Sequence, residues 1–390
     1  MKRIGILLAS EPGGGTFQYT QAMLDAVLAL PPGEFSVTAA VFNPDWLDHL
    51  RDDVAIVPLA HTQWNRGVNK AWHVSRLPIA VWRRTAARLD SNVRALLKAD
   101  AALWVCPNQD RYAFRAPIRA LGTVHDLMHR YEPRFPEVTL GGEYHAREFH
   151  FRETCRWSTG VLVDSEVGKR QLVESYGIAP TKVFPLPYIA PSYIYDKSAS
   201  TPEDVTRRYG LPDKFLFYPA QFFRHKNHAM LVSTIGRLRR AHPDVRLVLA
   251  GAQERNAYAD IRRMVDEQGL ADNVLFLGYV PQKDMPALYR KARALVMPTF
   301  FGPTNIPQLE AFALGCPVAT SRIYGIPEQV GDAALLFDPS SAEQIHAALL
   351  KLWTDDALCA ELTRRGFERA HRWGPSQFNQ RFREIVDALT

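Results

Sequence analysis

The sequence predicts an α/β protein with two doubly wound parallel sheets, one in each half of the chain. Its 390 residues are too many for one ordinary hydrophobic core and suit two domains of roughly 150 to 200 residues each. Hydrophobic residues make up 47% of the chain and no stretch has low complexity, which indicates a compact protein. Short apolar strands alternate with longer amphipathic stretches, and the alternation restarts after a proline-rich passage.

The first domain is expected at residues 1–195. Its strands are expected at 4–9, 36–42, 54–57, 101–106, 122–125 and 160–163. The first of these apolar runs meets Glu11 and Pro12 almost at once, so it is too short for the apolar region of a signal peptide. Its length and the glycines that follow favour a buried parallel strand.

A proline-rich passage at 184–192 and a polar run that ends near Pro202 predict a linker at 196–212. The second domain is expected at 213–372, with strands at 215–218, 245–250, 274–277, 294–297, 317–320 and 334–337. Residues 373–390 have helical apolar spacing, and we expect this helix to pack across both domains. Ligands bind beyond the carboxyl ends of such strands, so the domains are expected to face each other across a cleft.

Charge and cysteine usage narrow the function classes. The four cysteines have neither metal-ligand nor redox spacing, which favours reduced structural thiols and a cytoplasmic location. No apolar run approaches the roughly 18 residues of a membrane span. No nucleic-acid-binding module is present, so no nucleic acid partner is expected.

The net charge of +6 is concentrated in residues 66–98, where basic and large apolar side chains interleave. Two interpretations stay open for this segment. It is either the solvated face of helices that cover a core, or an amphipathic surface that docks on the inner face of an anionic membrane.

Three loops carry candidate binding residues. Gly13, Gly14 and Gly15 follow the first strand and precede a helix, where main-chain N–H groups can meet an anion. This loop lacks the dinucleotide fingerprint, because the third glycine would fall at Gln18 and no acidic residue ends the next strand at Asn43. A nicotinamide-dependent dehydrogenase is therefore disfavoured.

The second domain supplies the other two loops. Gln221, Arg224 and Lys226 follow its first strand, and the two cations there can bind a phosphate. Residues 298–305 form a loop rich in Gly, Pro, Thr and Asn after a strand, and Glu310 lies in the helix that follows. This loop and helix start suit a ligand with phosphates and hydroxyls.

Around Glu310 the chain closely resembles the retaining glycosyltransferases of family GT4, whose loop usually reads E-G-F-G-L-P-x-L-E-A. Glu310 matches the second glutamate, and Ile306, Pro307, Leu309 and Ala311 keep the frame. The resemblance extends to T-V-H-D-L at 123–127, D-S-E at 164–166, K-N at 226–227, F-L-G-Y-V at 276–280 and G-I-P-E at 325–328. It implies the GT-B fold of two Rossmann-like domains.

The resemblance also implies residue roles. Glu310 is expected on the nucleotide ribose, Lys226 and Arg224 on the diphosphate, and His125 on the donor sugar. Further donor contacts are expected from these residues: Gly13, Gly14, Gly15, Gln221, Gly278, Tyr279, Val280, Thr304, Asn305 and Ile306. In two places the chain departs from the family: Gly302 replaces the first glutamate of E-x7-E, and Gln221 replaces a frequent Arg or Thr.

The resemblance therefore implies a hexosyltransferase that moves a hexose or deoxyhexose from a nucleotide-diphosphate sugar to a saccharide or lipid-linked acceptor. Retention, no metal and no cofactor are expected, with bacterial surface polysaccharide or lipopolysaccharide synthesis as the setting and mannose as the working choice of sugar. Two alternatives remain. One is a GT-B sugar-nucleotide epimerase or hydrolase, and the other is a silent sugar-nucleotide-binding scaffold, which the loss of the glutamate at Gly302 favours.

Overall fold

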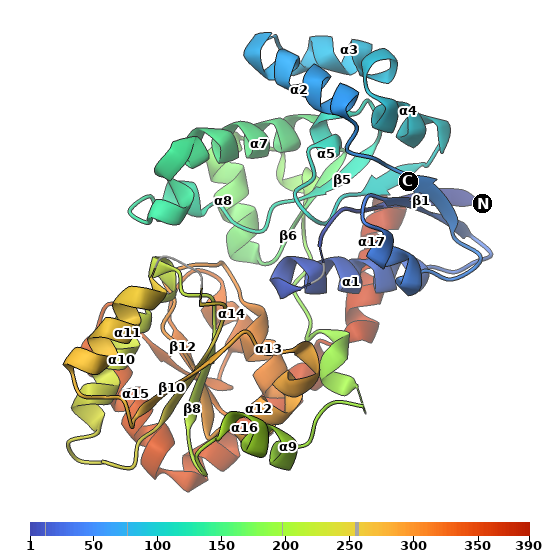
Figure 1. Ribbon diagram of the computed structural model, residues 1–390. Coiled ribbons are helices and arrows are strands. Elements are labelled where there is room, and N and C mark those ends of the chain that lie inside the picture. The colour runs from blue at the N-terminus through green and yellow to red at the C-terminus, as the bar shows by residue number, and fades with distance from the viewer. Residues whose placement is uncertain (12, 76, 197, 254–256) are drawn as a thin grey trace. The chain divides into compact units, whose positions relative to one another are not determined.

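The computed structural model describes residues 1–11, 13–75, 77–196, 198–253 and 257–390 (Figure 1). The chain divides into two compact units. Unit 1 contains residues 1–127, 145–187 and 375–390, and unit 2 contains residues 128–144 and 188–374. None of the helices among these residues is both long and apolar enough to cross a membrane.

Unit 1 is built on a seven-stranded parallel sheet with the order β3-β2-β1-β4-β5-β6-β7. The strands are β1 (Lys2–Leu8), β2 (Phe35–Val41), β3 (Ala55–Pro58), β4 (Leu103–Val105), β5 (Ala120–Thr123), β6 (Gly160–Val163) and β7 (Val183–Pro185). Ile4 of β1 lies opposite Val37 of β2 and Leu103 of β4. The continuous burial of the central strands fits a parallel sheet that is covered on both faces.

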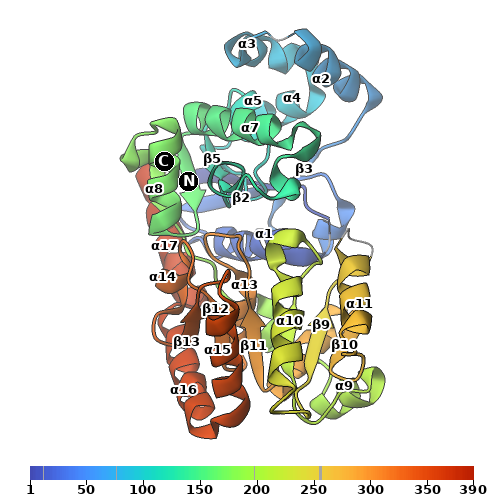
Figure 2. The ribbon, with the colours of Figure 1, turned by 90° about the vertical axis from the view of Figure 1, so that its left-hand side faces the viewer.

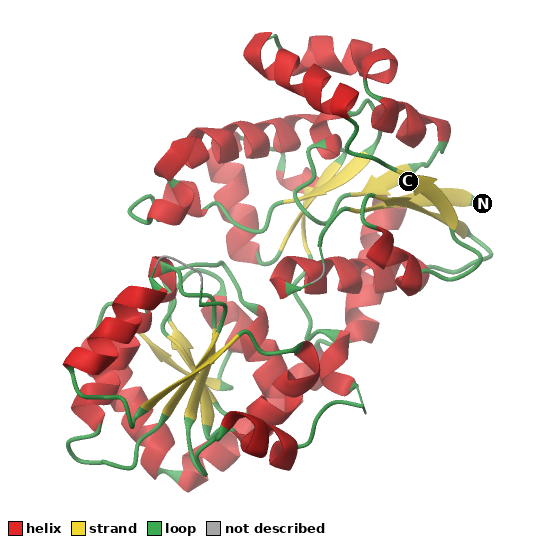
Figure 3. Cartoon of the chain, in the orientation of Figure 1, coloured by secondary structure: helices red, strands yellow, loops and turns green. Residues whose placement is uncertain are grey.

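Helices separate most strands of unit 1 along the chain, and a helix follows the last strand of unit 2 near the C-terminus. Figure 3 shows the helices in red and the strands in yellow. The helices of unit 1 are α1 (Gly14–Leu28), α2 (Gln63–Ser75), α3 (Ile79–Leu89), α4 (Ser91–Lys98), α5 (Tyr112–Arg115), α7 (Glu143–Trp157), which starts in unit 2, α8 (Glu166–Tyr176) and α17 (Pro375–Leu389). The expected terminal helix is thus present as α17. It belongs to unit 1, where it packs against α1 and where the Arg119 guanidinium donates to the carbonyl of Leu389 at 2.6 Å.

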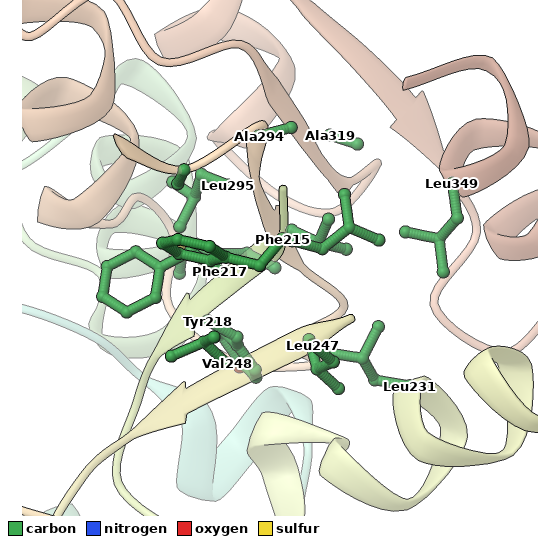
Figure 4. Close-up of a cluster of buried hydrophobic side chains, with 14 of the residues drawn as sticks. Phe215, Phe217, Tyr218, Leu231, Leu247, Val248, Ala294, Leu295, Ala319 and Leu349 are labelled. Atoms are coloured by element: carbon green, nitrogen blue, oxygen red, sulfur yellow. The ribbon is translucent and has the colours of Figure 1, made fainter. Parts of the chain in front are cut away.

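Unit 2 contains a six-stranded parallel sheet with the order β10-β9-β8-β11-β12-β13. The strands are β8 (Leu216–Pro219), β9 (Leu247–Ala250), β10 (Val274–Gly278), β11 (Ala294–Met297), β12 (Val318–Ser321) and β13 (Ala334–Phe337). Figure 4 shows the core of this unit, where Leu231 and Leu349, from two helices, join Phe215, Phe217 and the apolar side chains of the central strands.

The helices of unit 2 flank this sheet, with α10, α11 and α15 visible along it in Figure 2. Their bounds are α6 (Met128–Tyr131), α9 (Pro202–Tyr209), α10 (His228–Leu238), α11 (Tyr258–Glu267), α12 (Met285–Lys291), α13 (Ile306–Ala313), α14 (Ile326–Val330), α15 (Ala342–Thr354) and α16 (Asp356–Arg372).

The boundaries of the two units differ from the expected domains. Residues 183–185, expected within a proline-rich passage, form strand β7 beside β6, because a proline is tolerated on an edge strand. The expected linker at 196–212 contains helix α9, which a Thr201–Asp204 capping box begins. Asp284, fully buried, accepts hydrogen bonds from Arg208 and Tyr209 and fixes this helix to unit 2. Residues 128–144, which were expected in the first domain, belong to unit 2.

Candidate donor site

The candidate site of unit 2 lies where the strand order reverses. From β8 the chain proceeds to β9 and β10 on one side, and β11 then returns to the other side of β8. The loops after β8 and β11 are therefore neighbours at the carboxyl edge of the sheet. Such a switch point is where open α/β sheets bind ligands.

The turn Arg224–Lys226, which follows β8, is fixed by its carbonyl groups. The Tyr218 hydroxyl donates to the carbonyl of Lys226 at 2.8 Å, and the N–H of Phe300 donates to the carbonyl of His225 at 2.8 Å. Asn227 adopts a left-handed conformation with φ of 60°, and its amide donates to Pro298 at 3.0 Å. The turn is thus bound to the β11 loop at several points.

The positive charge of this turn comes from Lys226 and Arg224. Lys226 is half-buried, whereas Arg224 and Gln221 are exposed. Burial, followed by the nearby Lys226, lowers the pKa of His225 to about 2 and that of His228 to about 3. Both histidines are therefore neutral at physiological pH and add no charge to an anion site.

The β11 loop requires the glycine that replaces the family's first glutamate. Gly302 has a φ of +98°, and a Cβ built there would lie 2.9 Å from the carbonyl oxygen of Thr304 and 3.2 Å from the Asn305 side chain. A glutamate at this position would be strained by its backbone conformation and by these contacts. The backbone conformation of this loop therefore explains why a glycine replaces the family's glutamate at position 302.

A substitution of Gly302 tests this account. We expect Gly302→Ala to lower the free energy of unfolding by about 1–2 kcal/mol, because alanine must adopt a positive φ beside the Thr304 carbonyl. Urea denaturation measures the change. Gly33→Ala is the matched control, since a Cβ there meets nothing within 4 Å. Equal stability of the two variants would contradict the strain.

Helix α13 begins directly after Asn305, whose main chain is held by two hydrogen bonds to the Gln329 side chain. Its N–H donates to Oε1 of Gln329 at 3.0 Å, and Nε2 of Gln329 donates back to its carbonyl at 2.7 Å. Among the described residues, the buried Nδ2 of Asn305 has no hydrogen-bond partner. Thr304 is buried and Ile306 half-buried, so the three predicted contact residues lie together at the start of α13.

Glu310, on α13, is buried between two tyrosines. The hydroxyl of Tyr193 donates to Oε1 at 2.6 Å, and that of Tyr289, on α12, donates to Oε2 at 2.5 Å. Burial raises the pKa of Glu310, and the two hydroxyl donors oppose this shift. A ribose could contact Glu310 only through the remaining lone pairs of its oxygens or by displacing a tyrosine. The sequence analysis identified neither tyrosine.

The predicted base-binding residues end strand β10. Gly278 has a φ of 71° and its carbonyl accepts from the N–H of Gly251 at 2.8 Å, which joins the ends of β9 and β10. Tyr279 follows with 67% of its surface exposed, whereas Val280 is buried. An exposed aromatic ring at this edge is suited to stacking on a nucleobase.

The predicted residues of unit 1 lie on two loops. His125 follows β5, with its ring centroid 4.9 Å from that of Tyr19 on α1. Burial lowers the pKa of His125 to about 4, so the imidazole is neutral at pH 7. Asp126 binds Arg147 of α7 and so fixes this loop. Gly13, Gly14 and Gly15 are exposed at the start of α1, with φ of 107° for Gly13 and 74° for Gly14.

Two polar residues after β4 were missed by the sequence analysis. Strands β1 and β4 flank the switch point of the unit 1 sheet, so the loop at Asn108 and Asp110 follows one side of that point. Oδ1 of Asn108 accepts from Thr20 of α1 at 2.7 Å. Desolvation raises the pKa of Asp110 to about 7, despite an N–H donor from Asn108. The signal in the sequence was a polar run, N-Q-D, directly after an apolar strand.

Comparison with known proteins finds a family match within unit 2. Residues 206–369, which span most of unit 2, match the family described as "Glycosyl transferases group 1". O-antigen chain mannosyltransferase B of Escherichia coli is 26% identical over 329 residues, which cover 79% of this chain and 82% of that protein. Mannosylfructose-phosphate synthase of Agrobacterium fabrum is 26% identical over 242 residues, with 57% of this chain and 53% of that protein covered.

Among solved structures, Anabaena Alr3699/HepE in complex with UDP and glucose superposes with a TM-score of 0.74 at 16% identity, covering the whole of both chains. Its likeness establishes the architecture of two Rossmann-like domains. The chain thus has the GT-B fold, and residues 206–369 of unit 2 are similar to the group 1 glycosyl transferases.

Proposed function

We propose that this protein is a retaining, metal-independent hexosyltransferase of the GT4 type, which transfers mannose from a nucleotide-diphosphate donor to a saccharide or lipid-linked saccharide. The observation that carries the proposal is the anchored turn at Lys226 beside the buried Glu310 helix at the switch point of unit 2. The names of the two curated relatives support mannose, and that of the Escherichia coli protein supports a role in surface polysaccharide synthesis.

The chemistry requires a diphosphate leaving group to be stabilised. As the bond between the sugar C1 and the phosphate oxygen breaks, negative charge develops on the diphosphate, which Lys226 and Arg224 neutralise. The acceptor oxygen forms the new bond to C1 on the same face, and its proton passes to the departing phosphate oxygen. His125, neutral at pH 7, hydrogen-bonds the donor sugar.

The assay uses the full-length protein with GDP-mannose, UDP-glucose and a dTDP-sugar in EDTA, with and without a lipid-linked saccharide extract. We expect nucleotide release from one donor only when the extract is present, together with a glycosylated product. Release without acceptor would indicate a hydrolase, and conversion of the donor into an isomeric sugar nucleotide without release would indicate an epimerase. Tight donor binding without any turnover would indicate a sugar-nucleotide-binding scaffold, and a requirement for added metal would refute the metal-independent mechanism.

The protein is further proposed to dock on an anionic membrane through α2 and α3. These helices, with Leu77 between them, expose large apolar side chains: Trp64 (67%), Val74 (74%), Leu77 (50%) and Val81 (40%). Exposed basic side chains accompany them at Arg66, Lys70, Arg84 and Arg88. Arg76, of the same basic segment, lies outside the described residues.

The structure removes Arg83 from this docking surface. Its guanidinium donates to the carbonyl oxygens of Phe114 and Ala116, and its partial burial lowers its pKa. Trp72 and Trp82 are also absent from the docking surface, because their rings lie 5.2 Å apart within a hydrophobic cluster of unit 1. One face of residues 66–98 thus packs on the rest of unit 1, and the other face carries the exposed basic and apolar side chains.

Charge reversal tests the docking. We expect Arg84→Glu with Arg88→Glu to reduce co-sedimentation with anionic phospholipid vesicles at low salt by at least about fivefold, since each basic residue near the surface contributes roughly 1 kcal/mol. Arg170→Glu with Arg240→Glu makes the same change in net charge at exposed sites on α8 and just after α10 and is the control. Equal losses in both variants, or no binding by the wild type, would refute this surface.

A further inference from the structure

A segment between β5 and α7 connects two elements of unit 1 but packs on unit 2. We call residues 128–144 the strap. Its buried side chains Met128, Phe135 and Val138 form an apolar cluster with Phe300, Phe301 and Tyr324. Two of these partners lie in the loop after β11 and the third follows β12. The strap is therefore packed on loops at the carboxyl edge of the unit 2 sheet.

Polar contacts add to this apolar packing. The Tyr324 hydroxyl donates to Oε1 of Glu132 at 2.8 Å, and Oε2 of Glu132 accepts from Arg134 at 2.8 Å. The Arg134 guanidinium lies 4.5 Å from the ring centroid of Phe300. These contacts hold the strap on the loops after β11 and β12, and they do not include the turn at Lys226.

A second carboxylate of the strap does contact that turn. Oε1 of Glu137 accepts a hydrogen bond from the main-chain N–H of Arg224 at 2.5 Å and lies 3.5 Å from Nδ1 of His225. The carboxylate has only 16% of its side chain exposed. Because His225 is neutral, this contact is not an ion pair, and the N–H of Arg224 is the hydrogen-bond donor that holds Glu137.

The Glu137 carboxylate lies where its charge is unfavourable for binding an anion. A negative charge beside a turn that carries Lys226 and Arg224 weakens the attraction of that turn for a diphosphate, and its burial is itself unfavourable. This electrostatic cost is offset because Glu137 helps to fix the main chain of the turn. Tyr218 and Phe300 hold the carbonyl groups of Lys226 and His225, and Glu137 holds the N–H at the start of the same turn.

We propose that Glu137 is a positioning residue of the donor site, which fixes the Arg224–Lys226 turn so that Lys226 is presented to the diphosphate. This inference rests on the proposed function, because it assumes that Lys226 binds the donor. It assigns to the strap, which begins three residues after His125, a role in donor binding.

Calorimetry on the full chain tests the proposal, with the nucleoside diphosphate that the wild type binds most tightly and with the corresponding nucleoside. We expect Glu137→Ala to lower affinity for the diphosphate by about tenfold and to leave nucleoside affinity unchanged. Glu137→Gln keeps an oxygen acceptor and should stay within about threefold of the wild type. A double variant with Lys226→Ala should bind no more weakly than Lys226→Ala alone, since both losses act through one group.

Glu132→Ala is the matched control, because it loosens the strap at Tyr324 without removing the bond to Arg224. It should keep diphosphate affinity within about threefold. An equal loss in Glu132→Ala, an additive double variant or tighter binding by Glu137→Ala or Glu137→Gln would overturn the assignment. If the wild type binds no nucleoside diphosphate at all, the proposed function itself is wrong, whereas binding by the wild type with no effect at Glu137 rejects this inference alone.

Discussion

Replacement of Lys226 by alanine is expected to lower kcat by about a hundredfold or more, because in the proposed mechanism its ammonium group stabilises charge that develops on the diphosphate mainly in the transition state. The turn around it should survive, since Tyr218 and Phe300 bind main-chain atoms that alanine retains. The loss should therefore appear in turnover at saturating donor, with a smaller change in KM. Steady-state kinetics, with the donor that the transfer assay selects, measures kcat and KM.

Lys283→Ala is the control for the loss of a positive charge in the same unit. Lys283 is exposed, and its carbonyl oxygen accepts a hydrogen bond from the N–H of Ser200, which alanine would retain. Its kcat should equal that of the wild type within about twofold. A Lys226→Ala enzyme with full kcat would show that Arg224 and main-chain N–H groups suffice, and that the motif match had assigned the wrong cation.

The fold was predictable because its strands are buried on both faces. Continuous apolar runs mark such strands, and the expected positions at 160–163, 294–297 and 334–337 agree with β6, β11 and β13 at both ends. Strand β7 was missed because it has three residues and ends in Pro185, which in sequence indicates a loop. Its position at the edge of the sheet, which makes this proline acceptable, is a property of the tertiary structure.

For the candidate site, the sequence could offer only short local motifs. Lys226 and Glu310 were assigned by the resemblance of such motifs to family GT4, and their roles stay predictions. The partners that fix them lie far away in sequence: Tyr193 is 117 residues from Glu310, and Glu137 is 87 residues from Arg224. No spacing rule connects such pairs. The strap illustrates the same limit, because chain order assigned it to the first domain while its apolar side chains pack on the second.

Glu310→Gln is expected to reduce affinity for the nucleoside diphosphate by about 10- to 100-fold, the effect of losing a charged hydrogen-bond acceptor, with little change in kcat at saturating donor. The amide still offers one oxygen to the tyrosine pair, so the fold should persist. Glu310→Ala should bind equally weakly and also unfold at lower urea, because it leaves the buried hydroxyls of Tyr193 and Tyr289 without their acceptor.

The specific test of ribose recognition compares the nucleoside diphosphate with its 2′,3′-dideoxy analogue. If Glu310 binds the ribose hydroxyls, the wild type should prefer the ribonucleotide by about tenfold, and Glu310→Gln should lose most of that preference because the removed charge and the removed hydroxyls belong to one interaction. Tyr193→Phe should retain the preference, since it leaves the carboxylate in place. A Glu310→Gln protein that still discriminates between the two nucleotides as the wild type does would mean that Glu310 serves to hold its two tyrosines and that another group reads the ribose.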